Sequence, residues 1–165
     1  MNPVTASQAP WRKVLLALSM GLRIYLGLVF LYAAWGKIAD PRQFALSVAT
    51  YDILPLALIN LMAVLLPWIE VFVGLCIILG WWTRACALCI VGMMMMFIVA
   101  LSMALAKGLE MSCGCFASQE ASEEINGLTL VRDFAWLFAA AFVLVVDDGT
   151  WGFDGVWRRL RAHKA

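Results

Sequence analysis

The chain has 165 residues, of which 64% are hydrophobic and only 14% are charged, and its mean hydropathy is +0.90. Soluble domains have a much larger fraction of charged residues and a smaller fraction of apolar residues, so this composition excludes an ordinary soluble protein. A formal net charge of +1 creates no long-range field that would attract nucleic acid. The composition therefore predicts an integral membrane protein that does not bind nucleic acid.

Four apolar segments are long enough to cross a bilayer, which takes about 20 helical residues. They are residues 14–34, 57–79, 85–106 and 128–146. The last is the weakest, because its uninterrupted apolar part must be extended to include Arg132 and Asp133. The first could instead be a secretory signal peptide, but its apolar run exceeds the roughly 7 to 15 residues of a signal core. We expect one all-α domain over residues 1–165, a bundle of four transmembrane helices.

The Lys and Arg residues outside these segments are distributed unequally between the two sides of a four-span chain. One side carries Arg12, Lys13, Arg84, Arg158, Arg159, Arg161 and Lys164, and the other carries Lys37, Arg42 and Lys107. The positive-inside rule then places both termini, with the basic tail 151–165, in the cytoplasm of a bacterial inner membrane. The loop after the third segment would face the periplasm, which is oxidising.

The first outer loop predicts a short helix of its own. Asp40 is a suitable N-cap and Pro41 suits the first helical position. Apolar residues then recur at helical spacing, namely Phe44, Val48 and Tyr51. We expect an amphipathic helix that ends before Pro55 and either shields the top of the bundle or covers a redox site beneath it.

Cys113, Gly114 and Cys115 form a Cys-Gly-Cys motif in the polar loop between the last two apolar segments. Cysteines two residues apart can reach the Cα separation of a disulfide, about 4.4 to 6.8 Å, and the glycine tolerates the backbone angles of so tight a ring. Strained and exposed disulfides are the labile, catalytic kind. The motif therefore favours thiol–disulfide exchange by Cys113 and Cys115.

Two other interpretations of the motif stay open. The thiolates could bind a soft metal for delivery to an exported enzyme. They could also be a structural clip in a non-catalytic assembly factor. A redox role requires the thiol to ionise near neutral pH, which nearby cations favour. Lys37, Lys107 and Arg132 all lie near the outer ends of their segments, whereas Asp133 should point away from Arg132 because adjacent helical residues do not face each other.

The other three cysteines lie within the apolar segments. Cys76 belongs to the second, and Cys86 with Cys89 forms a Cys-x-x-Cys near the inner end of the third. In an apolar helix, small residues buried between helices are the expected interpretation.

Arg23 and Glu70 are ionisable residues inside the apolar segments, where they are costly and need partners. Each lies nine residues from the inner end of its segment, so antiparallel helices would place both at nearly the same depth. We expect them to form an intramembrane ion pair or to share a polar pocket. Such a pair could simply align two helices, or it could handle protons or bind a quinone. Pro67 should loosen the second helix next to this pocket.

Several common redox and catalytic sites are excluded by missing residues. His163 is the only histidine and lies in the tail, so a bis-histidine haem or a histidine zinc site within the membrane is excluded. Neither a glycine-rich nucleotide loop nor a serine–histidine or cysteine–histidine arrangement is present. Redox chemistry would have to use the thiols or a diffusible cofactor, and a quinone near Arg23 and Glu70 is the candidate.

Three stretches, taken together, resemble a known family. They are RIYLGLVFLYAAWGK from Arg23 to Lys37, LPWIEVFVGLCIILG from Leu66 to Gly80, and SCGCF from Ser112 to Phe116 followed by Arg132 and Asp133. This ordered set resembles the DoxX-like superfamily and, within it, the MauE branch of methylamine-utilisation membrane proteins. Ala117 is one departure, because a glycine would be expected after CGCF.

The resemblance implies a four-helix membrane bundle associated with periplasmic thiol–disulfide chemistry, with a thioredoxin-like or exported protein as partner. It carries over Cys113 and Cys115 as the redox pair and Arg23, Lys37, Glu70 and Arg132 as recurrent polar positions. Relatives in sulfur oxidation are linked with quinone reduction, and this branch could differ from them in substrate.

Overall fold

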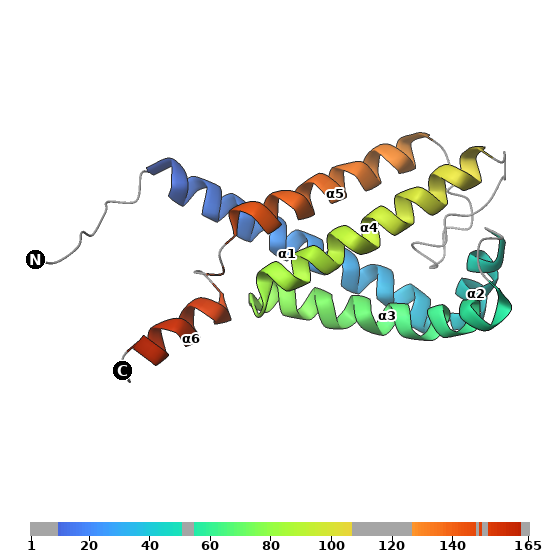
Figure 1. Ribbon diagram of the computed structural model, residues 1–165, viewed down its shortest axis with the longest axis horizontal. Coiled ribbons are helices and arrows are strands. Elements are labelled where there is room, and N and C mark those ends of the chain that lie inside the picture. The colour runs from blue at the N-terminus through green and yellow to red at the C-terminus, as the bar shows by residue number, and fades with distance from the viewer. Residues whose placement is uncertain (1–9, 51–54, 107–126, 148, 150–151, 163–165) are drawn as a thin grey trace, which may run out of the picture.

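The computed structural model describes residues 10–50, 55–106, 127–147, 149 and 152–162. In these ranges the chain forms six helices and no strand (Figure 1). The helices are α1 (Pro10–Ala39), α2 (Pro41–Thr50), α3 (Leu56–Leu79), α4 (Thr83–Ala106), α5 (Gly127–Val146) and α6 (Phe153–Ala162).

Four of these helices are long and apolar enough to cross a membrane, which confirms the predicted all-α, four-span architecture. The candidate spans are Pro10–Ala39, Ala57–Leu79, Thr83–Met103 and Leu128–Val146. The weakest predicted segment, 128–146, is a continuous helix that packs against α1 and α4. The chain is therefore a multi-pass membrane protein.

The bundle has two distinct ends. α2, the end of α4 and the start of α5 lie at one end, which we name the loop side (Figure 1). The start of α1, the turn between α3 and α4, and α6 lie at the other, which we name the terminal side. α1 packs mainly on α3, and α4 mainly on α5, with further contacts of α1 with α5 and α3 with α4.

Apolar side chains cover both the inside and the outside of the bundle. Leu26, Phe30, Ile77, Ile90 and Val143 are among the buried core residues. The outward faces are also apolar, and the exposed residues there include Leu28, Leu61, Phe72, Val99 and Phe138. Helices of a soluble bundle would present polar residues on that face, so these surfaces are suited to lipid.

The turn between α3 and α4 requires glycine at its first position. Gly80 adopts the left-handed conformation (φ 70), and the N–H groups of Gly80 and Trp81 donate to the carbonyls of Ile77 and Cys76. This pattern is a Schellman motif, which satisfies carbonyls at the helix end. A Cβ on Gly80 would also lie only 2.6 Å from the Cα of Gly152. The tight turn makes α3 and α4 antiparallel neighbours.

The predicted short helix in the first outer loop is confirmed as α2. The Asp40 carboxylate accepts a hydrogen bond from the backbone N–H of Gln43 at 2.9 Å, which is the expected N-cap contact. Phe44 is buried, and its ring centroid lies 5.2 Å from the Lys37 ammonium, so α2 covers the loop-side end of α1. Tyr51 lies outside the described residues.

Candidate functional site

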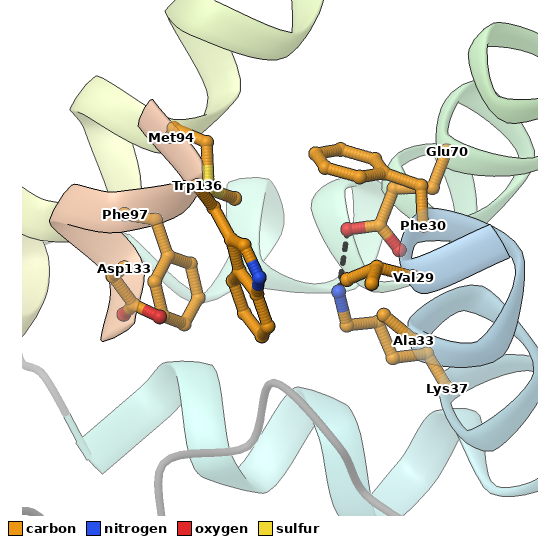
Figure 2. Close-up of a pocket in the computed structure, with 9 residues that line it drawn as sticks. All are labelled: Val29, Phe30, Ala33, Lys37, Glu70, Met94, Phe97, Asp133 and Trp136. Atoms are coloured by element: carbon orange, nitrogen blue, oxygen red, sulfur yellow. Dashed lines mark hydrogen bonds and ion pairs between the residues drawn. The ribbon is translucent and has the colours of Figure 1, made fainter. Parts of the chain in front are cut away.

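A small cavity lies inside the bundle, toward the loop side. Its volume is about 30 Å³, and all four spanning helices line it (Figure 2). Three of the lining residues are ionisable: Lys37 of α1, Glu70 of α3 and Asp133 of α5. The other walls are apolar and come from Val29, Phe30, Ala33, Met94, Phe97 and Trp136. Charged groups in so apolar a setting need partners.

Lys37 and Glu70 are partners in a buried ion pair. The Lys37 ammonium donates to Glu70 Oε1 at 2.5 Å, and the side chains are only 3% and 8% exposed. The predicted pairing of Glu70 with Arg23 is therefore replaced by a pairing with Lys37, which lies roughly 21 Å further along α1 from Arg23.

Arg23 has a different partner on the terminal side. Its Nη1 lies 3.4 Å from Oδ2 of Asp147, the residue directly after α5, and the Ser19 hydroxyl donates to the same oxygen at 3.4 Å. Arg23 does not lie at the depth of Glu70 because α1 begins four residues before the predicted segment. On the terminal side, α1 therefore extends beyond the end of α3. As a result Arg23 lies beside Gly80, at the very end of α3.

Asp133 also differs from its prediction. Its Oδ1 lies 3.6 Å from Nε of the preceding residue, Arg132, so the two residues do contact each other. The Arg132 side chain is partly exposed, stacks 4.9 Å from the Trp136 ring, and bends back toward the carboxylate. Backbone direction alone would separate the two side chains, but a long guanidinium side chain is flexible enough to return.

Two carboxylate oxygens in this region have no hydrogen-bond donor among the described residues. They are Glu70 Oε2 and Asp133 Oδ2, and both residues line the cavity. In Figure 2 the Trp136 ring lies between Asp133 and the Lys37–Glu70 pair. A cavity of this size holds roughly two water molecules, which can donate the missing hydrogen bonds. The cavity therefore has room for water beside these two carboxylates.

The expected quinone site is not formed by these residues. Arg23 and Glu70 lie at different depths and bind different partners. The cavity at Glu70, at about 30 Å³, is roughly a tenth of the smallest usual ligand pocket, about 300 Å³. A quinone head group does not fit, and we assign it no role in the chemistry below.

Cys113, Cys115 and Lys107 lie outside the described residues. The segment that contains them leaves α4 at Ala106 and enters α5 at Gly127, and both of these helix ends lie on the loop side (Figure 1). The cavity and the Arg132–Asp133 contact lie on the same half of the bundle. The chain thus connects the cysteine pair directly to the two helices that contribute Asp133, Phe97 and Met94.

The three cysteines within the spans are reduced, and two match their prediction. Cys76 and Cys86 are buried in the helix interface, where the Cys86 thiol contacts the Trp81 carbonyl at 3.5 Å. Cys89 instead is exposed on the outer surface of α4, so the expectation of burial is wrong for this residue. Cys86 and Cys89 do not face each other as a Cys-x-x-Cys pair, because one is inside the bundle and the other outside.

Comparisons with known proteins identify the family. A search of curated proteins and a search of solved structures each gave no match. A family model described as methylamine utilisation protein MauE matches residues 12–146, which cover α1 to α5. Since that match spans most of the chain and the whole four-helix bundle, the chain belongs to the MauE family.

Proposed function

We propose that this protein carries out thiol–disulfide exchange with an exported protein through Cys113 and Cys115. The observation that carries the proposal is the position of the Cys-Gly-Cys motif in the chain. It lies in the segment between α4 and α5, whose adjoining ends are both on the loop side of a MauE-family membrane bundle. A thiol pair at a membrane surface is within reach of soluble partners, whereas Cys76 and Cys86 are buried.

The proposed exchange needs no reagent beyond the two proteins. A partner thiolate attacks one sulfur of the Cys113–Cys115 disulfide, forming a mixed disulfide and releasing the other cysteine as a thiolate. The second partner thiolate then attacks the mixed disulfide and releases the first cysteine. The partner gains a disulfide as it loses two electrons, and the pair takes up those electrons and two protons as a dithiol. The same steps run in reverse when the partner is the oxidant.

The positions of the charged side chains indicate which of them can stabilise a thiolate of Cys113 or Cys115. The Lys37 ammonium is buried and bound to Glu70, so the bundle shields it from a thiolate at the membrane surface. Arg132 is partly exposed, lies in the second turn of α5, and is close in sequence to the cysteine-bearing segment. We therefore assign thiolate stabilisation to Arg132 together with Lys107, and assign Lys37, Glu70 and Asp133 the positioning of the helices beneath the pair.

The proposed orientation places the loop side in the periplasm and both termini in the cytoplasm of a bacterial inner membrane. The Lys and Arg distribution supports it, and the oxidising periplasm permits a disulfide at Cys113 and Cys115. The three motif stretches also support a wider placement of the chain in the DoxX-like superfamily.

Trapping tests the exchange. Replacing Cys115 with serine removes the resolving thiol if Cys113 is attacked, and Cys113→Ser does the same for the opposite order. We expect one of the two variants to accumulate a mixed disulfide with a periplasmic protein, visible as a dithiothreitol-sensitive band on a nonreducing gel. Cys89→Ser is the matched control, because it removes an exposed thiol from the same chain without affecting the pair.

The outcomes separate the proposal from its rivals. If neither single variant forms a mixed disulfide while the protein still supports its exported partner, the cysteines are a clip in an assembly factor. A metal-delivery protein would instead lose a stoichiometric bound soft metal in both variants, measured by elemental analysis of the purified protein.

Labelling tests the orientation independently. After reduction, a membrane-impermeant maleimide added to intact spheroplasts is expected to label Cys113 and Cys115 from the periplasmic face. The variant carrying both Cys113→Ser and Cys115→Ser should lose that label. Labelling that appears only in inverted vesicles would contradict the proposed topology and with it the exchange with exported proteins.

A further inference from the structure

α6 is fixed to the terminal side of the bundle by its first turn. The Asp154 N–H donates to the Gly80 carbonyl at 3.1 Å, and the Asp154 carboxylate accepts from the N–H groups of Trp82 and Thr83, both at 3.2 Å. The Phe153 and Trp81 rings lie 6.4 Å apart. Because Thr83 begins the third candidate span, these contacts hold α6 at the membrane boundary.

α6 has an exposed apolar face and a basic composition. Phe153, Trp157 and Leu160 recur at helical spacing, and each is more than half exposed. The helix also contains Arg158, Arg159 and Arg161, and the Arg161 guanidinium stacks 3.8 Å from the Trp157 ring. A short, basic, amphipathic helix at this depth has the properties of one that lies in the bilayer interface.

A hollow of about 410 Å³ lies between α6 and the first turn of α4. Trp82, Thr83, Arg84, Ala85, Gly149, Asp154 and Trp157 line it. Arg84 is exposed, while Thr83 is 1% exposed and its hydroxyl has no hydrogen-bond partner among the described residues. A buried hydroxyl with no partner is costly, so a hydrogen-bond acceptor that reaches it from the hollow would relieve that cost.

We propose that this hollow binds the headgroup of an anionic phospholipid from the leaflet on the terminal side, with α6 lying in the interface beside it. Arg84 neutralises the phosphate, the Thr83 hydroxyl donates a hydrogen bond to it, and Trp82 and Trp157 contact the glycerol and upper acyl region. Tryptophan is the residue that favours this depth of a bilayer.

Burial of acyl chains, rather than the charges in the hollow, favours a lipid over a free anion. Asp154 is an acidic lining residue, but its carboxylate accepts hydrogen bonds from the backbone N–H groups of Trp82 and Thr83. Asp154 and Arg84 line the same hollow, so the carboxylate weakens the attraction for any phosphate, whether free or part of a lipid. A phospholipid adds the burial of its acyl chains against Trp157 and Leu160, which a free phosphate lacks. α6 lies outside residues 12–146, so the wall of the hollow that α6 contributes is additional to the region that the family model matches.

Lipid titration of the full-length protein in detergent tests the proposal. The probes are dioleoyl phosphatidylglycerol, dioleoyl phosphatidylcholine and inorganic phosphate, and native mass spectrometry measures the bound fraction. We expect saturable binding of one phosphatidylglycerol, with Arg84→Gln weakening it about fivefold, the usual effect of one basic residue at a membrane surface. Thr83→Val should weaken it as well, because it removes the donor while keeping the shape.

Arg42→Gln is the matched control, because it removes the charge of an exposed arginine on the loop side. It should leave the affinity unchanged. Leu160→Gln tests α6 separately and should lower affinity without touching the hollow. The proposal is overturned if Arg84→Gln and Arg42→Gln weaken binding equally, if phosphatidylcholine binds as tightly, or if inorganic phosphate displaces the lipid.

Discussion

Replacing Lys37 with methionine is expected to destabilise the bundle strongly. The substitution leaves the Glu70 carboxylate buried without its cation, because the Glu70 side chain is only 8% exposed. Removing one partner of a buried pair costs about 3 to 5 kcal/mol. The thermal midpoint in detergent should fall by roughly 10 °C, at about 2 to 4 °C for each kcal/mol.

The double variant Lys37→Met and Glu70→Leu separates the pair from other effects. Because it removes both charges, it should recover most of the lost stability, as apolar replacements of buried ion pairs often do. Lys13→Met, which removes an exposed lysine of the same helix, is the matched control and should leave the midpoint unchanged. Additive losses in the double variant would show that Lys37 and Glu70 do not interact.

Replacing Gly27 with valine is expected to separate α1 from α3. A Cβ on Gly27 would lie 2.8 Å from the Gly74 carbonyl oxygen and 2.4 Å from Ile78 Cγ1. The first contact is with backbone, so relief requires movement of a whole helix. Overpacking typically costs about 1 to 3 kcal/mol, and here the shift would also strain the Lys37–Glu70 contact further along the same interface.

Gly21 provides the matched comparison on the same helix. A Cβ at Gly21 meets nothing within 4 Å, so Gly21→Ala should be neutral or stabilising, since alanine favours helix by about 1 kcal/mol over glycine. Gly27→Ala should instead lower the thermal midpoint despite the same gain in helix propensity. Equal effects of the two alanine variants would contradict the close packing of α1 on α3.

The four spans and α2 could be predicted because their signals are local. Each span needs only length and hydropathy, and α2 needs only the Asp40 cap and the recurrence of apolar residues such as Phe44. These properties depend on neighbours in sequence, which the chain displays directly.

The partners of the buried charges could not be predicted from the same signals. Counting residues from the apolar boundaries placed Arg23 level with Glu70, but the approach of Gly27 to Gly74 sets a different register. That register brings Lys37 to Glu70, and the extension of α1 leaves Arg23 for Asp147. Asp147 was not expected to be the partner of Arg23, because it directly follows the last apolar residue of α5 and its position in the sequence suggests a polar tail.

The separation in sequence of the charged partners constrains biosynthesis. When α1 leaves the ribosome, it carries Lys37 and Arg23, but their acidic partners follow 33 and 124 residues later. Cationic side chains without an acidic partner are costly in hydrocarbon. We therefore expect the nascent first helix to remain in the polar environment of the insertion machinery. Full release into lipid is then expected only after synthesis reaches Asp147, so that all four helices leave the translocon together.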